Sequence, residues 1–209
     1  MSMTAKPRKL ALERPDMRAH VLRAALLAIE EVGPARVRVQ DIADRAGMST
    51  GHVLYYFGRR DRVIIETLLM SEQELIARCR AELAGIEDPE AAVARYVTVY
   101  LPDGHDDIRW RLWSQVMAAP PADEETLLKL KEGLASWHAI LAGLVETGVA
   151  AGVFVPLDDP AFVAMRACRM MDGLGTDLMI GIPGHGTAWA VEAALAALRR
   201  DLLPPGTGS

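Results

Sequence analysis

The sequence predicts an all-α protein of about nine helices, divided into a small N-terminal unit and a larger C-terminal helical unit. Two observations predict this fold class. Ala and Leu dominate over Val, Ile and Thr, the residues that strands prefer, and only 5% of the 209 residues are aromatic. Gly and Pro divide the chain into helix-length segments, and no segment shows strand-like alternation. The length also leaves room for two unequal units.

The first three expected helices are closely spaced. The first covers residues 14–32, where apolar residues return at helical spacing until Gly33-Pro34. The second is short, covers residues 39–46 and is stopped by Gly47. The third follows a turn capped by Ser49 or Thr50, runs to about residue 56 and is halted near Gly58.

The remaining helices are longer. A fourth is expected over residues 59–83, long enough to connect the two units. Five more follow, separated by breaks at residues 88–89, 102–104, 120–121, 152–160 and 181–186. The predicted organisation is a flexible basic arm (1–13), a compact three-helix unit (14–63), a larger helical unit (64–203) and a disordered tail (204–209).

Residues 39–57 have the pattern of a helix-turn-helix. Gly47 supplies the positive φ angle that ends one helix, and Ser49 caps the next. A hairpin of two short helices cannot bury a core by itself, and therefore the first helix must pack against both of them. The expected core contacts join Leu22, Ala25 and Ile29 to Ile42, Ala43, Val53 and Phe57. Thr50, Gly51, His52, Tyr55 and Tyr56 are then left facing outward, where a DNA groove can receive them.

The charge distribution agrees with a nucleic-acid reader. Residues 1–62 hold 12 of the chain's 23 Lys and Arg but only 7 of its 28 Asp and Glu, although the whole chain has a net charge of −5. A basic head on an acidic body attracts phosphate locally. Lys6, Arg8 and Lys9 also suggest a minor-groove arm, although basic termini are more often simply solvated.

Residues 38–61, which read RVQDIADRAGMSTGHVLYYFGRRD, resemble the TetR family of transcriptional regulators, and the resemblance extends over residues 14–63. Beyond them, Asp172-Gly173-Leu174 resembles the subgroup with a BetI-like ligand domain. The chain departs from the family pattern at three positions. Arg38 stands where the family has Thr, Leu54 replaces a common Tyr with Tyr55-Tyr56 following, and Arg60 replaces a Lys.

The resemblance implies a sequence-specific DNA-binding protein, and chemistry suggests the role of each residue. Arg38, Tyr56 and Arg60 are expected to hold phosphates, whereas Thr50, Gly51, His52 and Tyr55 are expected to meet base edges. A single helix-turn-helix reads few base pairs, so a homodimer on near-palindromic double-stranded DNA is expected. The last two long helices, 160–180 and 187–203, are rich in small and apolar residues, among them Met165, Cys168, Met171 and Leu174, and are expected to form the dimer seam.

Between the fourth helix and the dimer helices lie most of the chain's aromatic residues. Six residues are expected to line a cavity for a small-molecule effector: Tyr96, Tyr100, Trp110, Trp113, Met117 and Trp137. Plain core packing is the alternative for each of them. The resemblance implies that the effector moves the fourth helix and releases DNA, which is the behaviour of a repressor; an activator of the same family stays open.

Other function classes fit the sequence less well. Nucleophile-elbow, phosphate-loop and dinucleotide-binding motifs are missing, and the five His and two Cys show no metal-ligand spacing, so no enzyme, metal or cofactor is predicted. A non-specific DNA binder is a further alternative. No apolar run is long enough to span a membrane and no signal sequence is evident, which predicts a cytoplasmic protein. Cys79 and Cys168 are predicted to be reduced and packed as small apolar residues.

Overall fold

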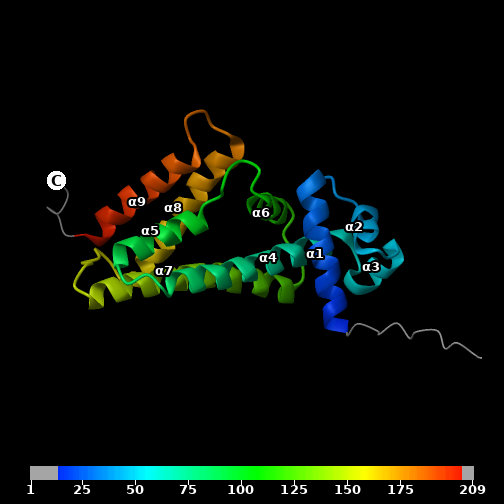
Figure 1. Ribbon diagram of the computed structural model, residues 1–209, viewed down its shortest axis with the longest axis horizontal. Helices are drawn as coiled ribbons and strands as arrows, with labels where there is room; N and C mark the ends of the chain where they lie inside the picture. Colours follow the sequence, from blue (N-terminus) through cyan, green and yellow to red (C-terminus); the bar gives the residue numbers. More distant parts are fainter. Residues whose placement is uncertain (1–13, 204–209) are drawn as a thin grey trace, which may run out of the picture. The chain divides into compact units, whose positions relative to one another are not determined.

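A computed structural model describes residues 14–203, and this part of the chain is all-α, as predicted (Figure 1). The expected arm (1–13) and tail (204–209) lie outside the described residues. The helices are α1 (Arg14–Val32), α2 (Val39–Ala46), α3 (Thr50–Phe57), α4 (Arg60–Leu83), α5 (Pro89–Tyr100), α6 (Ile108–Ala118), α7 (Glu124–Ala150), α8 (Pro160–Ile180) and α9 (Thr187–Leu202).

The turn between α2 and α3 has the expected geometry. Gly47 adopts φ 66° and ψ 34°, and its N–H donates to the carbonyls that end α2. Ser49 then caps α3, because its Oγ accepts a 3.2 Å hydrogen bond from the His52 N–H. At the start of α2 the Arg38 N–H donates to the Asp41 carboxylate at 2.7 Å, which is one half of a capping box. Local chemistry therefore fixes both helices of the hairpin.

The three N-terminal helices share one small core. α2 packs against both α1 and α3. The seven residues expected to meet there are all buried: Leu22, Ala25, Ile29, Ile42, Ala43, Val53 and Phe57. Because Val53 and Phe57 point inward four residues apart, the other sides of α3 are left at the surface.

The chain separates into two compact units with a division between Thr67 and Leu68. The sequence-based boundary lay a turn earlier, between Val63 and Ile64. Both positions fall inside α4, so this one helix contributes its first turns to the N-terminal unit and its remainder to the C-terminal unit.

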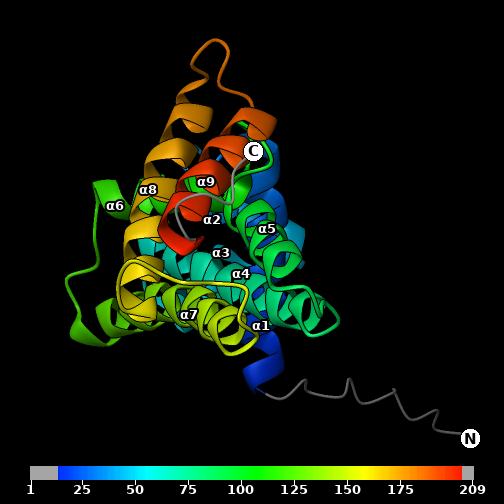
Figure 2. The same cartoon turned by 90° about the vertical axis from the view of Figure 1, so that its left-hand side faces the viewer.

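The C-terminal unit is a bundle in which α7 packs against α5 and α8, and α9 packs against α5 and α8. Figures 1 and 2 show α8 and α9 side by side, joined by the loop at residues 181–186. Cys79 and Cys168 are free and buried in this core, as predicted. Among the described residues, no helix is both long enough and apolar enough to cross a membrane.

The inner faces of α8 and α9 differ from the expected dimer seam. Cys168 and Met171 are fully buried within their own chain, because they face the core of the bundle and not a second copy. Met165 and Leu174 are half-buried. Two other large apolar side chains on α8 remain exposed: Phe162 is 49% and Ile180 70% accessible.

Candidate DNA interface and effector site

The outward side of α3 carries the residues expected to read base edges. Gly51, His52 and Tyr55 are exposed, with Tyr55 74% accessible, and Thr50 is half-buried at the start of the helix. Tyr56 is also half-buried. Its ring lies 5.3 Å from His52 and 5.4 Å from Tyr55, centroid to centroid, and the contact with Tyr55 is edge-to-face. The three rings therefore pack against one another in the protein without DNA.

No contact among residues 14–203 explains why position 51 is a glycine. A Cβ atom built there would meet only the Ser49 Oγ, at 3.9 Å, which is ordinary van der Waals contact. Gly51 has no positive φ, unlike Gly47. The space in front of Gly51 therefore stays free for something outside the protein.

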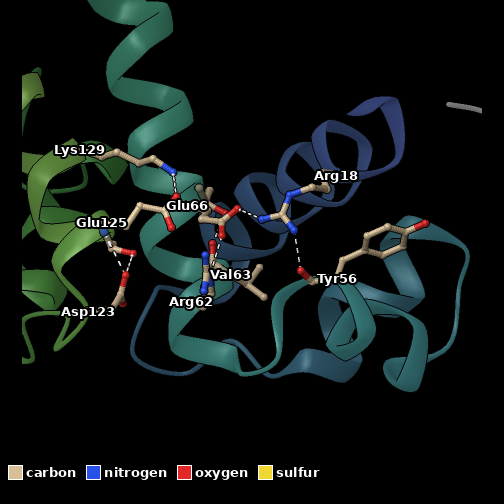
Figure 3. Close-up of polar contacts among 10 residues, drawn as sticks. Arg18, Tyr56, Arg62, Val63, Glu66, Asp123, Glu125 and Lys129 are labelled. Carbon is tan, nitrogen blue, oxygen red and sulfur yellow. Dashed lines mark hydrogen bonds and ion pairs between the residues drawn. The ribbon is translucent and has the colours of Figure 1, made fainter. Parts of the chain in front are cut away.

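Arg18 is a residue of this unit that sequence reasoning missed. Its Nη1 donates to the Tyr56 main-chain carbonyl at 2.6 Å, and its Nη2 forms an ion pair with Glu66 (Figure 3). The guanidinium also lies 4.5 Å from the centroid of the Phe57 ring. Arg62 donates to the same Glu66 carboxylate at 2.9 Å. Arg18 thereby ties α1 to the end of α3 and the start of α4.

Arg60 is held by main-chain carbonyls of the turn between α1 and α2. Its Nε donates to the Val37 carbonyl at 2.7 Å, and its Nη2 donates to the carbonyls of Pro34 at 2.5 Å and Ala35 at 3.2 Å. This arrangement favours a role in holding the turn over the expected phosphate contact. Arg38, the next residue after Val37, is exposed.

In the C-terminal unit, four of the six expected effector residues form one buried aromatic cluster: Tyr96, Tyr100, Trp110 and Trp137. Tyr100 lies at its centre, with ring centroids 5.3 Å from Trp137, 5.8 Å from Tyr96 and 6.5 Å from Trp110. Met117 does not belong to this buried cluster, because 67% of its surface is exposed. Trp113 is half-buried and reaches the cluster's acidic residue, Glu72.

Glu72 is the second residue that sequence reasoning missed. It is only 2% exposed, and its two carboxylate oxygens accept hydrogen bonds of 2.8 Å from the indole N–H groups of Trp113 and Trp137. A buried carboxylate is costly unless it is hydrogen-bonded or paired with a cation. Its one sequence signal is its position on α4, beside the apolar stripe formed by residues 68, 75 and 79.

A cation also lies in the cluster. The Arg109 guanidinium is centred 5.5 Å from the Trp110 ring and 5.9 Å from the Trp137 ring, within the range of cation–π attraction. Its Nη1 lies 3.5 Å from Glu72 Oε1, and its Nη2 donates to the Tyr100 carbonyl at 2.6 Å. The cluster therefore combines aromatic faces, one carboxylate and one cation.

Polar groups at the edge of the cluster fix its two tyrosines. Tyr100 donates its hydroxyl to Asp172 at 2.7 Å, and Tyr96 donates to the Trp137 carbonyl at 3.0 Å. Burial raises the pKa of both tyrosines well above the usual value. Both hydroxyls therefore stay protonated and act as donors near neutral pH.

Two buried nitrogen atoms lack a hydrogen-bond partner within residues 14–203: Trp110 Nε1 and His138 Nε2. Burial, helped by the nearby Arg169, lowers the pKa of His138 and favours the neutral ring. Trp110 as a whole is 8% exposed. A donor left without an acceptor in a buried site is a place where a ligand atom can be received.

Gly175 on α8 sets the position of Trp110. A Cβ atom at residue 175 would lie 2.1 Å from Trp110 Cη2, so the indole occupies the space that a side chain at residue 175 would need.

Beside the cluster, a groove of about 540 Å³ lies between α4, α5 and the start of α6. Arg109 lines this groove together with Glu74, Arg78 and Arg95. Arg109 therefore touches both the aromatic cluster and the groove.

Sequence models of two families match the chain. The model described as bacterial regulatory proteins, tetR family, matches residues 21–67, and the one described as BetI-type transcriptional repressor, C-terminal, matches residues 89–203. Among curated relatives, the HTH-type transcriptional regulator BetI of Stenotrophomonas maltophilia is 33% identical over 109 residues, or 50% of this chain and 55% of the relative. BetI 1 of Chromohalobacter salexigens is 34% identical over 84 residues, 39% of this chain and 40% of the relative. The chain thus spans about half the length of these relatives, or less.

Solved structures match over more of the chain. A transcriptional regulator from Saccharomonospora viridis in complex with choline has a TM-score of 0.78 and 25% identity, covering 90% of this chain and 98% of that one. The reduced form of NemR from E. coli has a TM-score of 0.71 at 17% identity, covering 91% and 100%. This second likeness shows the fold alone. With two family models that together cover the helix-turn-helix and most of the helical bundle, the chain belongs to the tetR family of bacterial regulatory proteins, with a C-terminal domain of the BetI type.

Proposed function

We propose that this member of the family is a transcriptional repressor that binds a near-palindromic operator as a homodimer and is released by a small-molecule effector. One observation carries the DNA-binding part. The helix α3 is fixed from behind by Val53, Phe57 and the Arg18 contact, while Gly51, His52 and Tyr55 stay exposed in front. A rigid helix with an open polar face suits the major groove. The site of action is then the bacterial cytoplasm.

The exposed residues divide by chemistry. Thr50, Gly51, His52 and Tyr55 meet base edges, with Gly51 allowing the backbone to approach closely. Arg38 and the hydroxyl of Tyr56 contact phosphates. Arg60 supports them from within by holding the turn that precedes Arg38.

The surfaces that the bundle leaves uncovered support dimerisation. Ile180 and Phe162 on α8 are exposed, and α9 carries half-buried Val191 and Leu195 outside its buried stripe. Two copies that pair these helices cover apolar surface and place two reading helices on one DNA molecule. The pairing uses these outer faces and not the buried faces of Cys168 and Met171.

The effector proposed here is a small organic cation. Faces of Trp and Tyr beside a carboxylate are the chemistry that recognises quaternary ammonium groups, and Glu72 with Trp110, Trp137 and Tyr100 supplies it. The regulator from Saccharomonospora viridis was solved with choline, which has such a group. The unpaired Trp110 N–H is a donor for an oxygen atom of the ligand. Glu72 lies on α4, the helix that belongs to both units.

The test begins with genomic fragments captured by the purified full-length protein. A captured fragment is then titrated with and without choline in a gel-shift assay, and transcription from it is measured in vitro. We expect a specific complex that choline weakens by about 5- to 150-fold, the usual range of coupling, and transcription that falls when the protein is added. Equal affinity for captured and unrelated DNA at fixed salt would show a non-specific binder. Transcription that rises on adding the protein would show an activator.

A further inference from the structure

The Arg109 guanidinium stands where the proposed effector's cation is expected. It lies near the faces of two tryptophans, 3.5 Å from the Glu72 carboxylate, and its side chain is only 11% exposed. Any small cation attracted to these rings and this carboxylate meets a site that already holds a cation. Two like charges cannot share it without strong repulsion. The effector must therefore displace Arg109.

The contacts of Arg109 allow this displacement. Its separation from Glu72 is longer than the roughly 2.7–2.9 Å of a close charge-assisted hydrogen bond. Glu72 keeps hydrogen bonds from Trp113 and Trp137 when the guanidinium leaves, so its oxygens are not orphaned. Within the part of the chain that the structure describes, the one short hydrogen bond of Arg109 goes to the Tyr100 carbonyl.

A destination for the displaced side chain is present. Arg109 also lines the 540 Å³ groove, together with the acidic residues Glu74, Asp103 and Asp107. A guanidinium that swings out of the cluster thus moves toward solvent and into a groove that carries these three carboxylates beside two further arginines, Arg78 and Arg95. Arg95 already has a carboxylate partner, Glu82, at 2.7 Å. The same groove gives an effector from solvent access to the position of Arg109.

We propose that Arg109 is an internal substitute for the effector's cation, which holds the aromatic site occupied in the ligand-free protein and sets how much effector is needed to fill it. This inference rests on the proposed cationic effector and adds the regulation of that site. If the guanidinium occupies the site for nine-tenths of the time or more, its removal tightens the apparent Kd about tenfold or more.

The experiment measures binding of choline and of tetramethylammonium to the full-length protein by calorimetry and by tryptophan fluorescence. Wild type is compared with Arg109→Gln, which removes the charge, and with Arg109→Lys, which keeps it. Arg95→Gln is the matched control, because Arg95 lines the same groove but is paired with Glu82 at 2.7 Å. Thermal melts check that each variant is folded. The uncharged carbon isostere of choline tests whether the charge matters.

We expect Arg109→Gln to bind both cations about tenfold or more tightly than wild type. Arg109→Lys and Arg95→Gln should stay within about threefold of wild type, a difference below 1 kcal/mol. The isostere should bind both wild type and Arg109→Gln far more weakly than choline does, because it lacks the charge that the aromatic faces and Glu72 attract. In Arg109→Ala, methylguanidinium should compete with choline more strongly than in wild type, because the site has lost its own guanidinium.

Opposite results separate the two proposals. Equal or weaker cation binding by a folded Arg109→Gln protein would overturn the role of Arg109 while leaving the cationic effector intact. Failure of wild type and of every Arg109 variant to bind either cation would overturn the effector class, and this inference with it. The DNA-binding proposal depends on neither result.

Discussion

Arg18 Nη1 donates a 2.6 Å hydrogen bond to the main-chain carbonyl of Tyr56. This bond joins α1 to the C-terminal end of α3, the helix proposed to enter the major groove. The same guanidinium forms an ion pair with Glu66 near the start of α4 and lies over the Phe57 ring. Three helices therefore meet at one side chain. The orientation of α3 depends on a residue that itself is not expected to touch DNA.

Replacing Arg18 by Met should destabilise the N-terminal unit. The substitution removes a charged donor from the Tyr56 carbonyl, and because Arg18 is partly exposed we expect a loss of about 1–2 kcal/mol in the free energy of unfolding. Urea denaturation followed by circular dichroism measures it. Arg23→Met is the matched control, since Arg23 is an exposed residue of the same helix. If Arg18→Met and Arg23→Met were equally stable, the contacts of Arg18 with Tyr56 and Glu66 would not stabilise the N-terminal unit.

Arg38→Ala and Arg60→Ala should weaken DNA binding for different reasons. Removing a phosphate contact lowers the slope of log affinity against log salt by about one, so Arg38→Ala should do this on every DNA sequence. Arg60 is engaged with main-chain carbonyls, so its loss should reduce affinity at an unchanged slope. Fluorescence anisotropy at several salt concentrations distinguishes the two. A lower slope for Arg60→Ala would instead restore the phosphate contact expected from the sequence.

Gly51→Ala should separate folding from DNA binding. Among residues 14–203, a methyl group at this position meets no atom closer than 3.9 Å, and Ala favours a helix over Gly, so the melting temperature should be unchanged or higher. Operator affinity should fall at least tenfold, because the methyl group keeps the backbone from the groove. An operator affinity equal to wild type would show that α3 does not approach DNA at Gly51.

Gly175→Ala should disturb the aromatic cluster. The new methyl group would overlap Trp110, and such overpacking typically costs about 1–3 kcal/mol. Choline binding should weaken as Trp110 moves. Gly133→Ala on α7 is the control, because a Cβ there meets nothing within 4 Å among residues 14–203. This variant should bind choline as wild type does and melt at an unchanged or higher temperature. The idea fails if both variants melt and bind choline as wild type does.

Stability should fall at alkaline pH. Burial raises the pKa of Cys168 from its ordinary value of 9.0 to about 11. The unfolded thiol ionises first as pH rises, so the contribution of Cys168 to the free energy of unfolding is fully present below pH 9 and is lost between about pH 9 and pH 11. Urea denaturation at pH 8 and pH 10.5 should show this loss, smaller in Cys168→Ala. Burial also raises the pKa of Cys79 to about 11, so both thiols are protonated and shielded from solvent at pH 8. A thiol reagent added to the folded protein at pH 8 should therefore label neither Cys79 nor Cys168, and rapid labelling of either would contradict their burial.

The helices could be predicted from the sequence because their ends are fixed locally. Gly47 and Ser49 act on residues only a few positions away, and Pro89 and Pro160 each begin a helix behind an Asp cap. Likewise the spacing of Val53 and Phe57 is enough to decide which side of α3 is buried.

The candidate effector site could be predicted only in part, since the residues that form it come from distant parts of the sequence. Glu72 contacts residues 37, 41 and 65 positions later, and no local pattern marks Arg109 as the cation near the aromatic faces. Met117 shares a helix face with Trp113 in the sequence, but α6 leaves it exposed. Arg60 was expected at phosphate because its charge fits, whereas its hydrogen bonds to the turn depend on the tertiary fold.

One measurement tests most directly the claim that the outward face of α3 reads DNA. It compares the affinity of the full-length protein for a captured operator with its affinity for a scrambled duplex of equal length at the same salt. Fluorescence anisotropy with wild type and Tyr55→Ala is sufficient. We expect wild type to prefer the operator by about a thousandfold or more, and Tyr55→Ala to lose about tenfold or more of that preference at unchanged stability. Equal affinity of wild type for the two duplexes would contradict the claim.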